Sequence, residues 1–321
     1  RQQLDEIREQ LQAQSVLRPE LLEMLRGYPR DADPMAALRT AISALGMFDA
    51  SSDDITSDSV RQKSLFLTAQ APTIVAAYDR LRKGKEALEP RPELGFAANF
   101  LYMLNGEVAN DTRCRTMDTA LVLHAEHGMN ASTFAARVTA GTLSDVYSAI
   151  TSAIGTLKGP SHGGANVEVM NMLREIDESG EDPGAWVRNA LGEGKKIMGF
   201  GHRVYKATDP RATVLRELAD RIMNEAGETR WLDLSDRIRA VMAEEMEKKG
   251  KKIYPNVDFF SASVYTTLGI EMDLFTAVFA IARMPGWTAH LMEQYADNRL
   301  IRPGSDYLGP RGLKVTPLDQ R

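Results

Sequence analysis

The chain has 321 residues, of which 43% are hydrophobic and 26% charged, a composition that suits a globular protein with a large core and two domains. Its net charge of −5 gives no overall basic field to hold nucleic acid, and its single cysteine, Cys114, excludes an internal disulfide framework and a cysteine-rich zinc site. No run of about 18 apolar residues occurs and the first residues do not resemble a signal peptide, so we expect no membrane span and a cytoplasmic protein.

In the first third of the chain, apolar residues recur three and four positions apart, which is the spacing of one helix face. Proline at a first turn and glycine after a last turn mark helices over about 19–27 and 33–46. A longer helix is predicted over 59–81, and Pro72 should interrupt it because proline removes a hydrogen-bond donor. The next helix is predicted around 96–103.

The rest of the chain continues the helical pattern. One long helix with many small residues is predicted over 132–157, and an apolar helix over 271–284 should end at Pro285. No extended alternation of apolar and polar residues and no repeat of 20–50 residues occurs, so the sequence predicts an all-α fold. The other helices are predicted at about 112–126, 167–175, 186–191, 209–222, 234–246, 258–268 and 287–295, followed by a loop-like tail from 298.

Three of the five histidines lie at breaks between helices, each beside a glycine: His127, His162 and His202. His124 and His290 fall inside helices, where a buried structural histidine is common. For any one of the three, a structural role is the more frequent explanation. The repeated placement nevertheless favours a shared cleft.

The stretch around His162 reads Gly159-Pro160-Ser161-His162-Gly163-Gly164-Ala165-Asn166. It is a turn followed directly by a helix, and free N–H groups with the helix dipole make such a start positive. A histidine held there is biased toward its neutral form. It can then donate a hydrogen bond to a carbonyl oxygen.

Charged residues supply a second set of candidates. Arg211, Arg283 and Arg302 lie at ends of predicted helices or beside proline, and guanidinium groups bind carboxylates through two hydrogen bonds. Each could equally form an ordinary surface ion pair. Asp258 precedes two phenylalanines at a helix start, so it is either a helix N-cap or a partly desolvated base.

The glycine-rich segment 195–202 does not match a dinucleotide-binding fingerprint, because no strand–helix unit surrounds it. Its two glycines, Gly199 and Gly201, would allow the backbone to approach a flat or phosphorylated ligand. The neighbouring Lys195, Lys196 and Lys206 would suit phosphate groups.

Several motifs in a fixed order resemble those of citrate synthases. The stretches that carry the resemblance are GPSHGGAN (159–166), GFGHRVYK with DPR (199–211), PNVD (255–258), HAEH (124–127) and DNRLIRP (297–303). The gaps also fit, because His202 follows His162 by 40 positions and Asp258 follows His202 by 56. The resemblance runs from about Arg1 to the C-terminus and is to the short bacterial type of the family. Family members usually begin with several tens of residues that precede the first residue here. Such a set is far more specific than any single motif.

The resemblance implies a citrate synthase that condenses acetyl-CoA with oxaloacetate and hydrolyses citryl-CoA to citrate and CoA, in the tricarboxylic acid cycle. Asp258 matches the base that removes a methyl proton, and His162 matches the donor to the developing enolate oxygen. His202 matches the histidine that polarises the keto group of oxaloacetate. No metal or redox cofactor is implied.

The resemblance also assigns substrate-binding residues. Phe279 matches an active-site phenylalanine, and Arg302 matches an arginine that reaches the site from the partner subunit. The residues implied for oxaloacetate are His127, His202, Arg211, Arg283 and Arg302. The residues implied for CoA are Ile197, Met198, Gly199, Phe200, Gly201 and Lys206.

At the level of architecture, the family implies a large helical domain and a smaller one that closes over the substrates. Mapped onto this chain, the large domain covers 1–163 and 265–321, and the small domain covers 164–264. The implied assembly is a homodimer with shared active sites, and hexamers are also known for short bacterial forms. No nucleic acid or membrane partner is expected.

Three alternatives remain at the level of sequence. A 2-methylcitrate synthase would use propionyl-CoA, and one methylene changes binding by only about 1–3 kcal/mol. An inactive assembly protein could keep the fold, although the intact set of His162, His202 and Asp258 argues against it. A metal hydrolase is disfavoured because no HExxH or comparable ligand spacing occurs.

Overall fold

The computed structural model describes residues 2–202, 205 and 207–321. Within these residues the prediction of an all-α fold is confirmed, and the one pairing of extended backbone is an isolated bridge between Phe200 and Pro255. The helices are α1 (Gln2–Ala13), α2 (Pro19–Arg26), α3 (Pro34–Met47), α4 (Ser57–Arg82), α5 (Phe96–Asn105), α6 (Asp111–His124), α7 (Ala131–Gly141), α8 (Val146–Leu157), α9 (Ala165–Ser179), α10 (Pro183–Gly192), α11 (Pro210–Ala226), α12 (Arg230–Lys248), α13 (Val257–Thr267), η1 (Met272–Leu274), α14 (Phe275–Ala296) and η2 (Leu318–Gln320).

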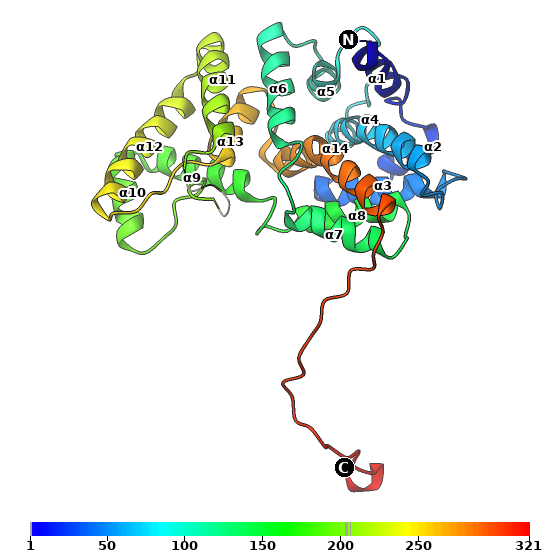
Figure 1. Cartoon of the computed structure of the whole chain (residues 1–321). Coiled ribbons are helices and arrows are strands. Elements are labelled where there is room, and N and C mark those ends of the chain that lie inside the picture. Colours follow the sequence, from blue (N-terminus) through cyan, green and yellow to red (C-terminus); the bar gives the residue numbers. More distant parts are fainter. Residues whose placement is uncertain (1, 203–204, 206) are drawn as a thin grey trace.

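The helices gather in two lobes that lie side by side (Figure 1). The larger lobe contains α1–α8 and α14, and the smaller lobe contains α9–α13. In the larger lobe α14 packs against α4, α6, α7 and α8, so it forms the centre of that lobe. The lobes meet where α6 contacts α11 and where α9 contacts α14.

Three predicted helix boundaries are wrong, one between α7 and α8 and two at prolines. The segment 132–157 forms two helices, α7 and α8, because Leu143 between them has a positive φ of 65°. Helical backbone cannot pass through that conformation. The carboxylate of Asp145 then caps α8 by accepting from the N–H of Ser148 at 2.9 Å.

The two helices expected to stop or be interrupted at proline continue through it. Pro72 lies inside α4 and Pro285 lies inside α14. Both prolines are in buried stretches, so the apolar area that these long helices bury outweighs one lost backbone hydrogen bond. At Gly286 a Cβ atom would lie only 2.1 Å from the carbonyl oxygen of Ala125, so glycine is needed for the close approach of α14 to the end of α6.

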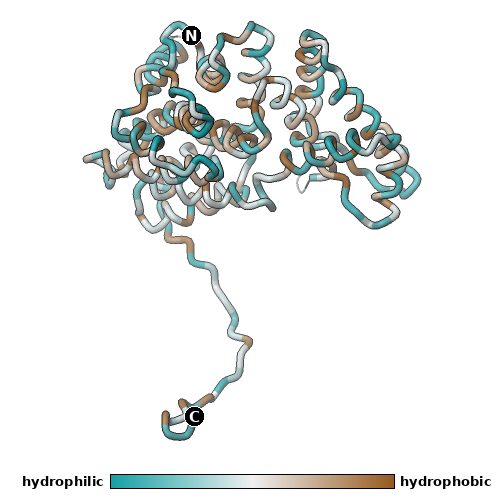
Figure 2. The backbone as a smooth tube through the Cα atoms, turned by 180° about the vertical axis from the view of Figure 1, so that it is seen from behind, coloured by the Kyte–Doolittle hydropathy of each residue, from teal (hydrophilic) through white to brown (hydrophobic). Residues whose placement is uncertain are grey.

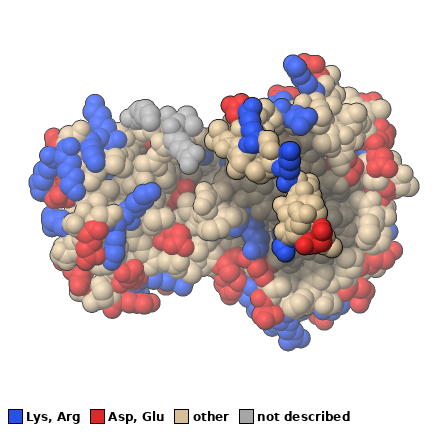
Figure 3. All heavy atoms as spheres, turned by 90° about the horizontal axis from the view of Figure 1, so that it is seen from below, with Lys and Arg blue, Asp and Glu red and all other residues tan. Residues whose placement is uncertain are grey.

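Beyond α14 the chain runs as an extended tail that leaves the larger lobe (Figures 1 and 2). Figure 3 views the molecule from below, so the tail is seen end-on in front of the larger lobe. Several of its apolar side chains are exposed, among them Leu308 at 94% and Leu318 at 82%. Among the residues that the structure describes, none of the helices has the length and apolarity needed to cross a lipid bilayer.

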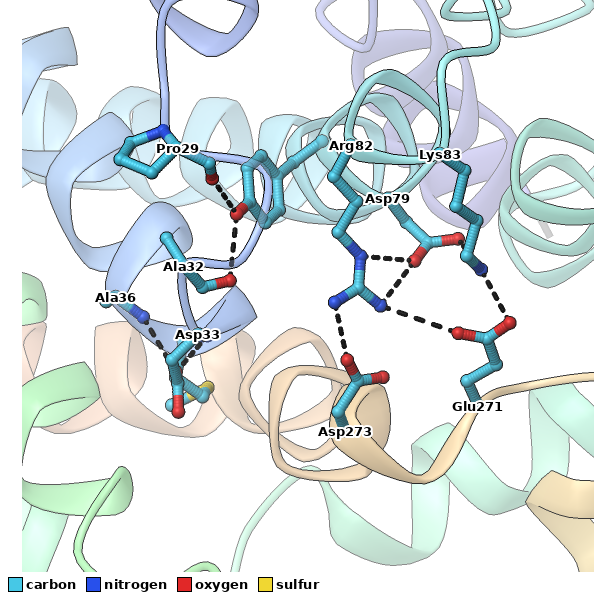
Figure 4. A network of polar contacts seen from close by, with 11 residues as sticks. Pro29, Ala32, Asp33, Ala36, Asp79, Arg82, Lys83, Glu271 and Asp273 are labelled. Atoms are coloured by element: carbon cyan, nitrogen blue, oxygen red, sulfur yellow. Dashed lines mark hydrogen bonds and ion pairs between the residues drawn. The ribbon is translucent and has the colours of Figure 1, made fainter.

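A network of charged side chains joins the end of α4 to the segment that leads into α14 (Figure 4). Arg82 donates to the buried carboxylate of Asp79 through Nε at 2.9 Å and Nη2 at 2.7 Å. The same guanidinium group pairs with Asp273 and, at 3.6 Å, with Glu271. Lys83 bridges Asp79 at 2.6 Å and Glu271 at 2.9 Å.

Substituting Arg82 with alanine is expected to lower the free energy of unfolding by about 3 kcal/mol, because the carboxylate of Asp79 would stay buried with only Lys83 as a partner. Urea unfolding followed by circular dichroism would measure the change. The matched control is Arg8→Ala, whose ion pair with Asp5 is exposed and should contribute less than about 1 kcal/mol. Equal effects of the two substitutions would contradict the expected role of the network.

Candidate active site

A cavity of about 1040 Å³ lies between the two lobes. Phe279 and Arg283 in its wall lie one turn apart inside α14. The other residues of the wall come from loops or helix ends. The structure therefore brings together residues that are up to 156 positions apart in the chain. The predicted site residues that line it are His127, His162, Gly201, His202, Arg211, Asp258, Phe279 and Arg283.

The ring of His162 is held by Ser132 at the start of α7. The backbone N–H of Ser132 donates to Nε2 at 3.2 Å, and the Ser132 hydroxyl lies 2.8 Å from the same nitrogen. A backbone N–H can only donate, so Nε2 carries no proton and the proton of the neutral ring is on Nδ1. Burial, and next the positive charge of Arg283, lower the pKa of His162, which keeps this neutral donor form at pH 7.

Ser132 is in turn held by buried groups. Its hydroxyl accepts from the indole N–H of Trp287 at 3.0 Å and lies 2.8 Å from Oδ1 of Asn130. Ser132 and Trp287 are both fully buried. Trp287 follows Phe279 and Arg283 at four-residue steps, so one face of α14 supports the cavity floor.

Asp258 occupies the first turn of α13, but it is not the cap of that helix. The side chain of Asn256 caps α13 by accepting from the N–H of Asp258 at 3.0 Å. The carboxylate of Asp258 is therefore available to the cavity. Burial raises its pKa from 3.8 to about 6, while Arg211 and Arg283 oppose the shift and Asp209 adds to it.

Arg211 is oriented by Asp209, the buried N-cap of α11. The guanidinium donates to both carboxylate oxygens, from Nε at 3.1 Å and from Nη2 at 2.9 Å. Burial by itself would raise the pKa of Asp209, but the hydrogen bonds and charge of Arg211 outweigh it and the pKa is lowered. Asp209 also accepts from the N–H of Val257 at 3.2 Å, which ties the start of α11 to the start of α13 beside Asp258.

Arg283 is 2% exposed, and its Nε donates to the carbonyl oxygen of His124 at 2.7 Å. Among the described residues no carboxylate lies within ion-pair distance of it. Burial, followed by the charge of Arg211, lowers its pKa to about 10, so it stays positive at neutral pH. Two buried or half-buried guanidinium groups facing one cavity make that cavity suited to a carboxylate ligand.

His127 and His202 form the opposite part of the wall, with ring centroids 5.0 Å apart. Burial and the charge of Arg211 lower the pKa of both rings. The N–H of Tyr205 donates to Nδ1 of His202 at 3.2 Å, so the proton of neutral His202 is on Nε2. The hydroxyl of Tyr205 lies 3.1 Å from Nε2 of His127.

The segment implied for CoA, residues 197–201, is hydrogen-bonded to the residues just before α13. Gly199 and Gly201 have positive φ angles of 78° and 87°. Their backbone groups pair with the segment before α13, for example through the N–H of Asn256, which donates to the carbonyl of Gly199 at 2.8 Å. A Cβ atom at Gly199 would lie 2.8 Å from Phe259, so only glycine fits there.

Of the residues implied for CoA that the structure describes, only Gly201 lines the cavity. Ile197 is buried, and Met198, Gly199 and Phe200 do not face the cavity in this structure. Lys206 lies outside the described residues. Their contact with CoA stays a prediction.

Arg302 does not belong to the cavity formed by its own chain. It is exposed on the extended tail, four residues after Asn298, where the tail is anchored to α7. The anchor is formed by Asn298, whose side chain donates to the carbonyl of Gly141 at 3.3 Å, and by Gln294, which donates to Asn298 at 3.1 Å. A contribution of Arg302 to the site therefore requires a second copy of the chain, and it stays a prediction.

Sequence reasoning overlooked four residues that support the site: Ser132, Tyr205, Asp209 and Trp287. Asp209 could have been identified, because a carboxylate two residues before Arg211 is close enough to pair with its guanidinium group. Ser132 follows the break after His127, where a helix begins. No sequence pattern indicated a role for Trp287, because its hydrogen-bond partner Ser132 is 155 positions away in the chain.

Comparison with known proteins identifies the family. A model described as the C-terminal domain of citrate synthase matches residues 1–304. The chain belongs to the citrate synthase family. "Citrate synthase 2" of Bacillus subtilis is 49% identical over all of this chain and 85% of its own length. A "2-methylcitrate synthase 2" of Corynebacterium glutamicum is 41% identical over all of this chain and 83% of its own.

The fold agrees with solved citrate synthases. A ternary complex of carboxymethyl coenzyme A and oxaloacetate with the citrate synthase of Thermoplasma acidophilum superposes with a TM-score of 0.90. It is 32% identical, over all of this chain and 84% of that one. The chain is thus an all-α condensing enzyme of the acyltransferase type, as the sequence motifs predicted.

Proposed function

We propose that this citrate synthase family member condenses acetyl-CoA with oxaloacetate in the cavity between the lobes and hydrolyses the resulting thioester. The observation that carries the proposal is the meeting of His162, His202 and Asp258 in one wall beside Arg211 and Arg283. The relatives named citrate synthase support acetyl-CoA as the acyl donor.

In the first step Asp258 takes a proton from the methyl group of acetyl-CoA. A carboxylate of raised proton affinity suits this task. As the thioester carbonyl becomes an enolate, the Nδ1–H of His162 donates to its oxygen. Ser132 holds the ring in the tautomer that this requires.

In the second step the enol carbon attacks the keto carbon of oxaloacetate. His202 transfers its Nε2 proton to the keto oxygen, which becomes the hydroxyl of citryl-CoA, and the imidazole regains a proton to replace it, in balance with the methyl proton that Asp258 took. Arg211, Arg283 and His127 hold the two carboxylates of oxaloacetate. Water then cleaves the thioester and releases CoA.

Release of CoA thiol from acetyl-CoA, measured with and without oxaloacetate, tests this function. We expect release only when both substrates are present. No release by the purified protein would favour an inactive assembly protein of the same fold.

A second candidate is 2-methylcitrate synthesis from propionyl-CoA, favoured by the 41% identity to an enzyme of that name. Comparing kcat/KM for the two acyl-CoA substrates decides between them. A higher value with propionyl-CoA would replace the first proposal.

We further propose that the smaller lobe, about residues 164–264, moves as a domain that closes over bound substrates. Its residues supply His202, Arg211 and Asp258, whereas the larger lobe supplies His127 and Arg283, so closure would complete the site and exclude water. The placement of the protein in the cytoplasm stays a prediction.

We also propose a homodimer in which Arg302 enters the partner's cavity. The support is the tail, which extends away from its own lobe (Figures 1 and 2) and carries exposed apolar side chains. Arg302→Ala is then expected to weaken oxaloacetate binding by about 10- to 100-fold, because one carboxylate loses a charged partner. Titration calorimetry would measure it.

Mixing Arg302→Ala and Asp258→Ala subunits gives a sharper test when the oxaloacetate concentration is too low for either variant alone to turn over. In a mixed dimer one site has both defects and the other has neither, so part of the activity should return. Lys314→Ala, on the same tail, serves as a control that should leave oxaloacetate binding unchanged. Verified mixed dimers without any recovery would contradict a shared site.

A further inference from the structure

Tyr205 lies among three of the residues that are proposed to contact oxaloacetate. Its hydroxyl is 3.1 Å from Nε2 of His127, and its ring centroid is 4.7 Å from that of His202. The guanidinium carbon of Arg211 is 5.7 Å from the same ring. No other tyrosine lines this cavity among the described residues.

The hydrogen bond to His127 conflicts with substrate binding. Each ring nitrogen of a histidine forms one in-plane hydrogen bond, either through its N–H or through its lone pair. A carboxylate that His127 holds through Nε2 needs that one position, and the phenolic oxygen occupies it in this structure. The hydroxyl and a substrate carboxylate are therefore alternatives.

Space for a displaced ring exists next to the site. A second cavity of about 140 Å³ shares Gly201, His202 and Tyr205 with the main cavity, so Tyr205 stands in the wall between the two. The far side of the second cavity is formed by Lys252, Tyr254 and neighbouring residues. Rotation of the side chain toward it would release His127 without moving the backbone N–H that fixes the tautomer of His202.

We infer that Tyr205 sets the affinity for oxaloacetate by competing with the substrate carboxylate for His127. This inference rests on the proposed function, since it takes His127 as a carboxylate ligand. Tyr205 thus opposes binding in the empty enzyme and must leave Nε2 of His127 when the dicarboxylate enters. A tyrosine that served as an additional substrate ligand would have the opposite effect.

The test is whether one substitution raises or lowers the affinity for oxaloacetate. Tyr205→Phe keeps the ring and removes only the hydroxyl, so it should tighten oxaloacetate binding about threefold to tenfold, the size of one net hydrogen bond. Titration calorimetry of the full-length protein with oxaloacetate alone measures this without catalysis. A mere disturbance of the loop cannot tighten binding.

Tyr28→Phe is the matched control. The hydroxyl of Tyr28 is buried without a hydrogen-bond partner among the described residues and lies in the larger lobe away from the cavity, so oxaloacetate affinity should not change. Unchanged or weaker binding by Tyr205→Phe would overturn the inference. A wild-type protein that binds no oxaloacetate would instead refute the proposed function.

A crystal structure with oxaloacetate gives an independent check. We expect the Tyr205 hydroxyl to be more than 3.5 Å from Nε2 of His127 in the complex, with a carboxylate oxygen in its place. A complex in which both contacts coexist would overturn the inference even if the affinity changed.

Discussion

Replacing Asp258 with asparagine is expected to lower kcat by about 10³-fold, because the side chain keeps its shape but can no longer accept the methyl proton. Oxaloacetate binding should remain within about twofold of wild type, since the proposed carboxylate ligands are untouched. Steady-state release of CoA and calorimetric titration with oxaloacetate measure the two quantities. Lost oxaloacetate binding in a folded variant would count against a role limited to proton transfer.

The same substitution should make the protein more stable. The pKa of Asp258 is about 6 in the folded chain against 3.8 for a free side chain, so the native state binds this proton more tightly than the unfolded state. The free energy of unfolding therefore falls as pH rises from about 3.8 to 6, and at pH 7 the ionised carboxylate costs about 3 kcal/mol of stability. Asp258→Asn removes this cost and should raise the thermal midpoint at pH 7. A lower midpoint would show that the carboxylate stabilises the fold.

The raised pKa of Asp258 also predicts the acid limb of the pH profile. The base must be ionised, so kcat/KM should fall about tenfold per pH unit below pH 6 and level off above it. An unshifted aspartate would place this limb near 3.8. A wild-type profile that stays flat between pH 7 and pH 5 would exclude Asp258, with this raised pKa, as the base.

The second large effect is expected at His162. His162→Ala removes the Nδ1–H that faces the thioester oxygen, and the loss of one such donor should lower kcat by about 10²- to 10³-fold. Oxaloacetate affinity should not change, because His162 is not among its ligands. Single-turnover release of CoA measures the chemical step directly.

Ser132→Ala provides a graded comparison for His162. It removes the hydroxyl, which lies 2.8 Å from Nε2 and donates to Oδ1 of Asn130, but leaves the backbone N–H that donates to Nε2, so the ring is held less firmly while its tautomer is kept. We expect a loss of about tenfold in kcat, well below that of His162→Ala. If the two variants lost the same activity, the backbone N–H would not be what holds the tautomer.

Much of the local structure could be read from the residues in order. Asp33 and Asp209 precede proline at the starts of two predicted helices, and both cap their helices because a carboxylate there accepts from free N–H groups. The helix break at Leu143 could not be predicted from the sequence, and neither could the continuation of α4 through Pro72 and of α14 through Pro285. They depend on what each segment packs against, and distant parts of the chain supply that packing.

The sequence by itself determined the helical class, the family and the chemical types of the groups that carry the reaction, since these follow from periodicity and from short motifs in a fixed order. Only the tertiary structure decided the protonation states and hydrogen-bond partners of these groups. The tautomer of His162, the raised pKa of Asp258 and the charge of Arg283, which has no carboxylate partner among the described residues, arise from burial and from partners such as Ser132. Such effects depend on distances of a few ångströms between residues far apart in the chain, and no local pattern encodes them.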